Sequence, residues 1–443
     1  MTQFKTQELK SLWDRLVLYW YFPLQSLVYF TKMLGSSVNN YVGIPLNLLF
    51  ILLSTKKAIY TAFNKSKNNG DVLVLFFLGY SLLSGILTVF GGFQLECYTA
   101  SLKIFIIPIF FYFWGRNSKD ISYNFYRYFI WTCFIAMTIG LFLYLTMPSF
   151  YSAYLLQLYQ ESWMRQGNEV TADMIIDTHR FSAFFSSSYS VCFFAVPALV
   201  IVLGCCVRGK IKSVLGKYGK TMPLFHIIVA VFIISSILSL QRIAMVCSVA
   251  IVIFYFIYGL RQKSVEITTT YIAIALGIAF ISLSIIPRLA GDRNDVISEN
   301  IALRIDRMNF NDAMNERTSQ YGFVADNLEL FIFVGTGLGS AGNKAAELGH
   351  KGVTDGEFVR MFAELGLVGC MCFWYLIFGT VRRGFRYFKL YNTELIIIGF
   401  FLLAGIGANS LSMNLWSGIF WYSIGRIWNK QFRDYNFLSA KNE

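Results

Sequence analysis

The sequence predicts an all-α polytopic membrane protein, and three observations lead to that fold class. Hydrophobic residues make up 56% of the 443 residues and charged residues only 14%, whereas a soluble domain is about a quarter charged. A transmembrane helix needs roughly 20 mainly apolar residues, and the chain contains twelve such runs. Lys and Arg are concentrated in alternate connections, as expected of a chain that crosses a membrane repeatedly.

The twelve predicted transmembrane helices follow one another along the chain. Their approximate bounds are 16–34, 40–55, 71–92, 98–115, 126–147, 187–207, 223–240, 243–260, 268–287, 358–380, 393–411 and 413–428. The first ends near Lys32, and the second is short unless it continues into "STKKAIY".

The distribution of Lys and Arg predicts the orientation, because cytoplasmic connections carry an excess of these residues. If both termini are cytoplasmic, 25 of the 38 Lys and Arg residues fall in cytoplasmic segments. The net charge of +13 then reflects membrane topology, and no nucleic-acid partner is expected. The eight cysteines lie in or beside apolar segments, so no disulfide framework is predicted.

Two polar segments on the predicted outer side are too long to be simple connections. A connection of about seventy residues is usually functional or disordered, and apolar residues recur at helical spacing in the longer one, so we expect it to be folded and helical. The chain is therefore divided into N-terminal helices (1–147), a first outer loop (148–186), central helices (187–287), a large, partly helical outer loop (288–357) and C-terminal helices with a tail (358–443).

The motif "GTGLGS", residues 335–340, has the glycine content of a phosphate-binding loop. It lacks the lysine of a P-loop, no βαβ pattern surrounds it, and it faces away from the cytoplasm. We therefore interpret it as a tight, glycine-dependent turn that returns the chain to the membrane surface.

Three arginines on the predicted outer face are candidate ligands of a pyrophosphate. Arg180 begins "RFSAFFSSSYS", Arg242 lies in the short turn "SLQRIAM", and Arg317 lies in "NERTSQYGF". Arginine at membrane depth is costly, and its planar guanidinium suits bidentate contact with phosphate. Ion pairs are the alternative interpretation for two of them, Arg180 with Asp177 and Arg317 with Glu316, whereas Arg242 has no acidic neighbour in the sequence.

The motif "GVTDGEFVRMFAELGLVG" places charges at the start of the tenth predicted helix. Thr354 and Glu357 fit a capping box, in which Thr354 caps the helix and Glu357 reaches back. Arg360 is spaced to pair with Glu357 and Glu364. Asp355 has no part in these pairs, so we predict it as the catalytic base or as a residue that orients a sugar.

His350 and Glu357 are rival candidates for the catalytic base. A neutral imidazole is the usual general base near neutral pH, although a lone histidine in a loop is often incidental. Gly366 and Gly369, in the same motif, suit close helix–helix contact. No paired His, Cys or Asp arrangement indicates a metal, and no metal or other cofactor is expected.

Taken together, these motifs resemble the O-antigen polymerase and ligase superfamily of bacterial surface-polysaccharide assembly. Four features carry the resemblance: "RFSAFFSSSYSVCFF", "SLQRIAMVCSVAIVIFYF", the long outer loop with "GTGLG", and "TDGEFVRMFAELGLVG" fifteen residues beyond it. With the predicted helices they span most of residues 70–430. The resemblance implies a GT-C-like helical fold and a metal-independent membrane glycosyltransferase with a sugar donor linked to a lipid pyrophosphate.

The resemblance is closer to the Wzy-type polymerases than to the ligases. Ligases typically carry His-Asn, and polymerases often carry Asp-Asn, where this chain has Asp355 and Gly356; Gly356 departs from both patterns. A polymerase would transfer the growing glycan from undecaprenyl pyrophosphate to the next lipid-linked unit. The alternatives are a ligase that transfers glycan to the lipid A core, and a transporter of polysaccharide or lipid-linked sugar.

The resemblance also implies the partners and the location. The expected partners are undecaprenyl-pyrophosphate-linked oligosaccharides, membrane lipid and a chain-length regulator. The expected location is the bacterial inner membrane, with both termini in the cytoplasm and the active site facing the periplasm. A transporter would place ionisable residues near the midplane and at both faces, whereas the sequence predicts that they gather at the outer face.

Overall fold

The computed structural model describes most of the chain as helices. The described residues are 2–33, 39–63, 68–117, 123–163, 181–185, 188–215, 222–261, 333–342, 344–345, 348, 356–412 and 416–429. Within these ranges there is no β-strand, so the predicted all-α class is confirmed for this part of the chain.

The first half of the chain contains most of the described helices. They are α1 (Thr2–Met33), α2 (Ile44–Phe63), α3 (Asn69–Phe90), α4 (Leu95–Ser101), α5 (Ile107–Ile109), α6 (Phe111–Asn117), α7 (Asn124–Thr146), α8 (Pro148–Trp163), α10 (Ser188–Val207) and α11 (Ile211–Leu215), with π-helical turns η1 (Asn39–Gly43) and η2 (Leu102–Ile106). The second half adds α12 (Met222–Leu238), α13 (Arg242–Arg261), α20 (Glu357–Arg386), α21 (Phe388–Gly405) and α22 (Ser417–Trp428).

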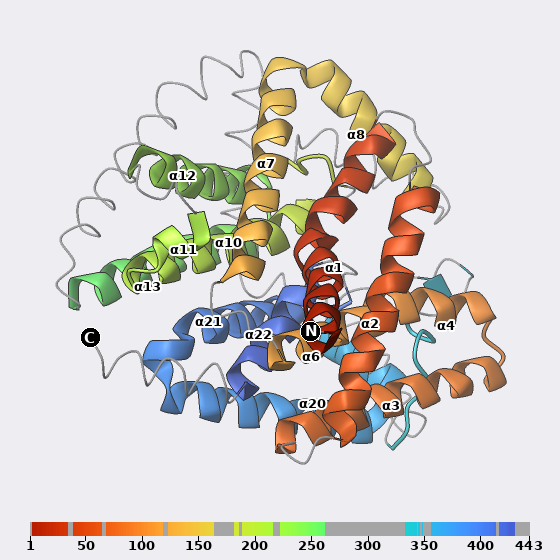
Figure 1. Cartoon of the computed structure of the whole chain (residues 1–443). Coiled ribbons are helices and arrows are strands. Elements are labelled where there is room, and N and C mark those ends of the chain that lie inside the picture. The colour runs from red at the N-terminus through yellow and green to blue at the C-terminus, as the bar shows by residue number, and fades with distance from the viewer. Residues whose placement is uncertain are drawn as a thin grey trace. The chain divides into compact units, whose positions relative to one another are not determined.

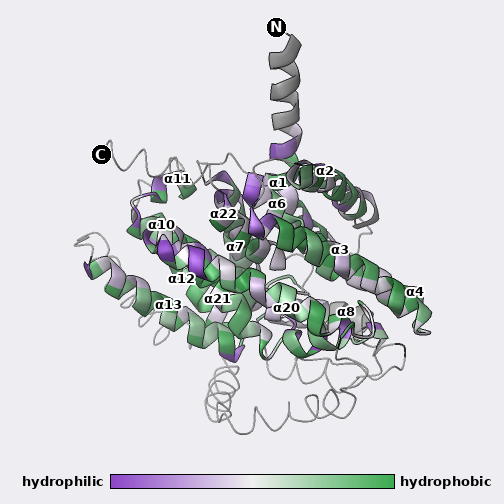
Figure 2. Cartoon of the chain, turned by 90° about the horizontal axis from the view of Figure 1, so that it is seen from below, coloured by the Kyte–Doolittle hydropathy of each residue, from purple (hydrophilic) through white to green (hydrophobic). Residues whose placement is uncertain are grey.

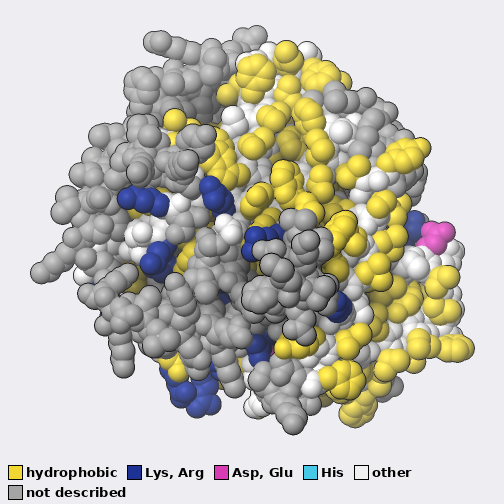
Figure 3. Space-filling model, viewed as in Figure 1, with side chains coloured by type: hydrophobic (Ala, Val, Ile, Leu, Met, Phe, Trp, Pro, Cys, Tyr) yellow, Lys and Arg dark blue, Asp and Glu magenta, His cyan; other side chains and the backbone are white. Residues whose placement is uncertain are grey.

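Eight helical segments of the described chain are long and apolar enough to cross a membrane. They are Tyr41–Phe63, Asn69–Phe90, Leu95–Asn117, Asn124–Thr146, Ser188–Val207, Arg242–Arg261, Glu357–Arg386 and Phe388–Gly405. Long helices such as α3 and α13 are predominantly hydrophobic (Figure 2), and hydrophobic side chains spread over a broad part of the surface in Figure 3. The chain is therefore a polytopic membrane protein.

Four of the twelve predicted transmembrane helices are not among these eight. Segment 16–34 overlaps α1, which does not qualify as a span, and segment 223–240 corresponds to α12, whose apolar part is Leu224–Leu238. Segment 413–428 contains the 12-residue helix α22, which is about 18 Å long and therefore too short to cross the hydrocarbon. Segment 268–287 lies outside the described residues.

The chain forms two compact units, each built from segments that are distant in the sequence. Unit 1 comprises Met1–Asn47 and Ser122–Asn309, and unit 2 comprises Leu48–Ile121 and Phe310–Glu443. In unit 1, α10 is almost completely enclosed, and α7, α12 and α13 contact it (Figure 1). The ring of Phe129 lies 5.1 Å from that of Phe22 and 5.8 Å from that of Phe194, so α1, α7 and α10 share one aromatic core.

Unit 2 is organised around the short helix α22, all of whose residues are buried. It packs backbone to backbone against α6, because a Cβ atom at Gly115 would overlap the carbonyl oxygen of Tyr422 and one at Gly425 would overlap that of Tyr112. Such close approach of small residues is typical of helices packed inside a membrane protein. The apolar character of α22 therefore reflects burial within the protein.

Helices α3 and α20 lie alongside each other in unit 2 (Figure 1). The Sγ atom of Cys372 lies 3.5 Å from the carbonyl oxygen of Leu73, and the hydroxyl of Tyr80 donates to the carbonyl oxygen of Leu365 at 2.9 Å. Later residues of α3 thus meet earlier residues of α20, so the two helices are antiparallel. The end of α3 and the start of α20 consequently lie at the same end of the unit.

Candidate functional site

Only two of the six predicted site residues, Arg242 and Glu357, are described by the structure. The other four lie outside the described residues: Arg180, Arg317, His350 and Asp355. Arg242 belongs to unit 1 and Glu357 to unit 2, and each lies in a separate polar cluster.

Arg242 is the first residue of α13 and is half-buried. Its side chain forms no ion pair or hydrogen bond with any other described residue, and the first turn of α13 contains no acidic residue. The N-terminus of a helix carries a partial positive charge, so a cation there is disfavoured. The guanidinium and the helix end therefore form a local excess of positive charge that suits an anion.

The turn before Arg242 brings the starts of two helices together. The side-chain amide of Gln241 donates to Ser188 Oγ at 2.7 Å, and both residues are buried. Ser188 begins α10 and Arg242 begins α13. The two helices therefore start side by side, and both present their N-terminal N–H groups at the end of unit 1 where Arg242 lies.

The chain that follows Arg180 packs against the same turn. The backbone N–H of Phe181 donates to the carbonyl oxygen of Leu238, the last residue of α12, at 2.9 Å. Leu238 precedes Arg242 by only four residues. The two sequence motifs that contain Arg180 and Arg242 are thus brought together in the fold, although sixty-two positions separate these arginines.

Two residues of this cluster have strained backbone conformations. Leu240 has φ 51° and Ala183 has φ 52°, in the left-handed region that L-residues rarely adopt. Such a conformation costs about 1–3 kcal/mol and is usually found where function requires it. In the described chain only three non-glycine residues have a clearly positive φ, and the other is Tyr123, so the strain is concentrated where the two arginine motifs meet.

In unit 2, helix α20 is interrupted at Gly366. This glycine has φ 62° and ψ −167°, which are not helical values. The carbonyl oxygens of Ala363 and Glu364 instead accept hydrogen bonds from the backbone N–H groups of Thr336 and Gly337, both at 2.9 Å. Interrupted helices are tolerated in membrane proteins only where other groups satisfy the freed backbone, and here the "GTGLGS" segment does so.

Residues 333–342 form a strap across the interruption, and three of its glycines cannot be replaced without strain. Gly335, Gly337 and Gly339 have φ values of 74°, 99° and 97°. A Cβ atom at Gly337 would overlap Thr88 Oγ1, and one at Gly339 would overlap the carbonyl oxygen of Cys97. The prediction of a glycine-dependent turn is therefore confirmed, and the turn is packed against α3 and α4.

The strap differs from a phosphate-binding loop because N–H groups at its centre already have partners within the protein. Those of Thr336 and Gly337 donate to α20, and that of Ser340 donates to the carbonyl oxygen of Gly337 at 3.2 Å. A phosphate-binding loop needs N–H groups that point at its ligand. The glycines here serve close backbone packing.

The charged residues at the start of α20 form a buried triad, which consists of Glu357, Arg360 and Glu364. Arg360 Nη2 lies 2.7 Å from Glu357 Oε1, and Arg360 Nε lies 3.9 Å from Glu364 Oε2. All three side chains are at most 3% exposed. The predicted pairing of Arg360 with both acids is confirmed, and one cation compensates two carboxylates.

The carboxylate of Glu357 is fully occupied by hydrogen bonds. Oε1 accepts from Arg360 and from Ser412 Oγ, both at 2.7 Å. Oε2 accepts from the backbone N–H groups of Leu411 and Ser412, at 3.0 and 3.1 Å. Glu357 therefore ties the start of α20 to the turn that follows α21, an arrangement that fits a structural role better than that of a catalytic base.

The predicted capping box is wrong. The cap of α20 is Gly356, with φ 101° and no side-chain hydrogen bond, and Glu357 is the first helical residue. Thr354 therefore does not occupy the cap position. The carboxylate of Glu357 instead bonds to the 411–412 turn.

Glu364 faces the strap. The backbone N–H groups of Gly339 and Ala341 lie towards its carboxylate, and a Cβ atom at Gly342 would lie 3.5 Å from its Oε1. This Oε1 is buried and has no hydrogen-bond partner among the described residues, as is also true of Arg360 Nε. The acid therefore contributes to holding the strap against the interruption in α20.

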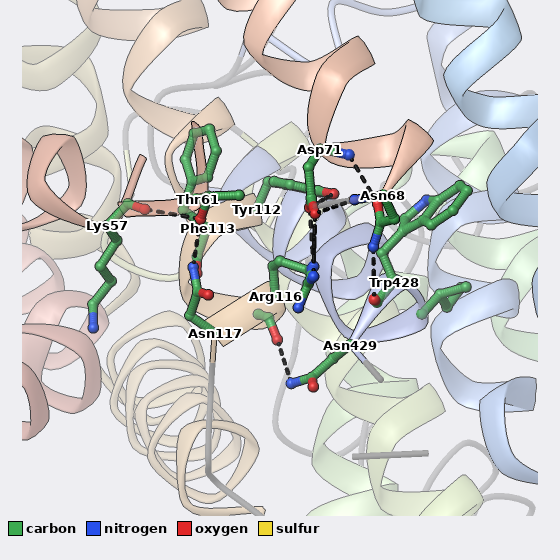
Figure 4. Close-up of polar contacts among 12 residues, drawn as sticks. Lys57, Thr61, Asn68, Asp71, Tyr112, Phe113, Arg116, Asn117, Trp428 and Asn429 are labelled. Carbon is green, nitrogen blue, oxygen red and sulfur yellow. Dashed lines mark hydrogen bonds and ion pairs between the residues drawn. The ribbon is translucent and has the colours of Figure 1, made fainter. Parts of the chain in front are cut away.

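A second buried ionic cluster, at the opposite ends of α3 and α20, was not predicted. Asp71 accepts hydrogen bonds from Tyr112 Oη at 2.7 Å, from Arg116 Nε and Nη2 at 2.9 and 3.1 Å, and from the backbone N–H of Asn68 at 2.9 Å (Figure 4). Asn68 and Asp71 form a capping box at the start of α3. The four-residue motif Asn-x-x-Asp, with its two polar residues three positions apart, is the sequence signal that would have indicated this cap.

Buried charge therefore occurs at both ends of unit 2, and the prediction that it gathers at one face is wrong. Glu394 and Arg426 form another pair, 3.1 Å apart and at most 2% exposed. Asp71 and Thr88 lie near opposite ends of α3, about 26 Å apart at 1.5 Å per residue. The pairs near Asp71 were missed because their partners come from different helices.

No family model, curated protein or solved structure that was compared with the chain matches it.

Proposed function

We propose that this protein is a membrane glycosyltransferase that polymerises lipid-linked oligosaccharide units into surface polysaccharide, as O-antigen polymerases do. The observation that carries the proposal is the packing of the Arg180 and Arg242 motifs against each other in unit 1. A polymerase needs cationic groups from separate segments to converge on one pyrophosphate. Arg242 stands at a helix start and has no ion-pair partner among the described residues, which fits that requirement.

The reaction would join two lipid-linked glycans. A hydroxyl of the acceptor unit attacks the anomeric carbon of the donor, the bond from that carbon to the pyrophosphate oxygen breaks, and undecaprenyl pyrophosphate leaves. Arg180, Arg242 and Arg317 would stabilise the charge that develops on this leaving group, which is the largest catalytic demand. Asp355 would take the hydroxyl proton, with His350 as the rival base.

The proposed location is the bacterial inner membrane, with the arginines and the start of α20 facing the periplasm and both termini in the cytoplasm. The excess of Lys and Arg in the opposite connections supports this orientation. The proposed partners are undecaprenyl-pyrophosphate-linked oligosaccharides, membrane lipid and a chain-length regulator.

The buried charges near Asp71 do not favour a transporter over a polymerase. Asp71 is saturated by Arg116, Tyr112 and Asn68, so it offers no open position to a transported ion or sugar. Such a paired and hydrogen-bonded carboxylate stabilises helix packing.

The proposal is tested by Arg242→Ala in cells whose own copy of the gene has been deleted. The variant should insert into the membrane normally, because Arg242 has no described partner to lose, and it should produce no long-chain glycan on a gel. Arg261→Ala is the matched control, since Arg261 is an exposed arginine at the other end of the same helix. A wild-type glycan ladder in the Arg242→Ala strain would contradict the pyrophosphate role.

The same strains distinguish a polymerase from a ligase. Loss of a polymerase leaves lipid A core that carries a single unit, whereas loss of a ligase leaves long glycan on the lipid carrier and none on the core. Accumulation of lipid-linked polymer in the Arg242→Ala strain would favour the ligase.

A further inference from the structure

We infer that Gln241 is a positioning residue, which acts through Ser188 to hold the Arg242 guanidinium where the leaving pyrophosphate develops charge. This inference rests on the proposed function, because it assigns a role towards the same leaving group. Gln241 is uncharged, and its proposed role requires no direct contact with the substrate.

Gln241 is held at both its side chain and its backbone. Its Nε2 atom donates to Ser188 Oγ at 2.7 Å, across 53 residues of sequence. Its backbone N–H lies 3.4 Å from Ser239 Oγ, and that hydroxyl donates to the carbonyl oxygen of Ser236 at 2.7 Å. Gln241 and Ser188 are 6% and 3% exposed, so the contact between them is shielded from competing water.

Gln241 also sets the start of α13. Its carbonyl oxygen accepts the first hydrogen bond of that helix, from the backbone N–H of Met245 at 3.1 Å. Arg242 is the next residue, so the rotation of the Arg242 side chain about the helix axis depends on where Gln241 is fixed. The side-chain hydrogen bond to Ser188 fixes it relative to α10.

The strain at Leu240 explains why the hydrogen bond between Gln241 and Ser188 is needed. With φ 51°, Leu240 lies in a conformation that would relax if its neighbours did not hold it. The backbone N–H of Leu240 donates to the carbonyl oxygen of Ile237 at 3.0 Å on one side, and Gln241 is anchored on the other. Without the hydrogen bond to Ser188, the turn that precedes Arg242 is free to relax. Arg242 would then be displaced from the starts of α10 and α13.

Loss of the hydrogen bond between Gln241 and Ser188 is expected to lower the catalytic rate. A displacement of about 1 Å at a catalytic group lowers the rate by up to roughly 100-fold. Gln241→Leu keeps the approximate volume of the side chain and removes the donor. We therefore expect kcat per folded molecule to fall about 10- to 100-fold, while KM for the lipid-linked unit changes much less, because the substitution removes no group that the proposal places on the substrate.

The experiment compares Gln241→Leu, Ser188→Ala and the double variant. Each full-length protein is purified, reconstituted in liposomes and supplied with lipid-linked units extracted from cells that lack this gene. If Gln241 acts through Ser188, the two single variants lose similar activity and the double variant loses no more than either. A purely structural role would lower the amount of folded protein or its unfolding temperature and leave kcat per folded molecule unchanged.

The outcomes separate this inference from the proposed function. Wild-type kcat in Gln241→Leu, in an assay where Arg242→Ala is inactive, would overturn the positioning role and leave the polymerase proposal standing. Additive losses in the double variant would also overturn it. Full activity of Arg242→Ala would overturn the pyrophosphate role, and the inference with it.

Discussion

Replacing Gly337 by alanine adds only one methyl group, but we expect it to destabilise unit 2 by more than such a small change normally does. Gly337 lies at the centre of the strap across the interruption in α20. A Cβ atom there would overlap Thr88 Oγ1 and would lie 2.5 Å from the Thr88 backbone nitrogen and 2.6 Å from the Ser84 carbonyl oxygen. Two of these three atoms belong to the backbone of α3 and cannot rotate away.

The magnitude follows from two separate costs. The φ of 99° at Gly337 costs an alanine about 1–2 kcal/mol, and forcing an extra methyl group into a packed interior costs about 1–3 kcal/mol more. We therefore expect a loss of about 2–5 kcal/mol for Gly337→Ala. The loss should increase if relaxation of the strap also frees the carbonyl oxygens of Ala363 and Glu364.

Two other glycines of unit 2 provide matched controls. Gly92 has φ 84°, but a methyl group added there would meet no atom within 4 Å, so Gly92→Ala should show only the conformational cost of about 1–2 kcal/mol. Gly79 lies inside α3, has no positive φ and has open space around it, so Gly79→Ala should stabilise the protein by about 0.5–1 kcal/mol.

The assay is thermal unfolding of the detergent-solubilised proteins, followed by tryptophan fluorescence and by the fraction that stays monodisperse after heating. The expected order of unfolding temperatures, from highest to lowest, is Gly79→Ala, wild type, Gly92→Ala and Gly337→Ala. Equal unfolding temperatures for Gly92→Ala and Gly337→Ala would refute the packing of the strap against α3.

Two further substitutions test the buried ion pairs by the same thermal assay. Arg360→Met should cost about 3–5 kcal/mol, because it leaves Glu357 and Glu364 buried without a compensating cation; the control Arg386→Met, at an exposed position of the same helix, should change stability by less than about 0.5 kcal/mol. If Arg360→Met and Arg386→Met changed the unfolding temperature equally, the triad would not be buried as described. Asp71→Asn should also cost about 3–5 kcal/mol, because Arg116 loses its buried partner, and a wild-type unfolding temperature would contradict the network in Figure 4.

Long apolar helices and contacts within one helix could be predicted from the sequence. The eight membrane-spanning candidates all overlap predicted segments, because a run of about 20 apolar residues is a property of the local sequence. The pairing of Arg360 with Glu357 and Glu364 followed from helical spacing alone. The glycine dependence of residues 335–340 followed from their composition.

Contacts between distant segments could not be predicted in this way. The interruption at Gly366 lies within a continuous apolar run, and a glycine is common inside a transmembrane helix; the break is stable only because the N–H groups of the strap satisfy the carbonyl oxygens that it frees. Likewise, Glu357 bonds to Ser412, 55 residues away, whereas local spacing pointed to Thr354. The apolar run that contains α22 predicts a membrane span, although α22 is buried within the protein. Burial among other helices and burial in lipid both favour apolar residues, so the sequence alone does not distinguish them.

The central claim is that this chain itself joins lipid-linked units, and reconstitution tests it most directly. Purified full-length protein in liposomes, supplied only with lipid-linked units extracted from cells that lack the gene, should yield a ladder of glycans on the lipid carrier. The Arg242→Ala protein, folded to the same extent, should leave the units unjoined. If the wild-type protein leaves the units unjoined, or joins glycan only when lipid A core is added, the polymerase proposal is contradicted.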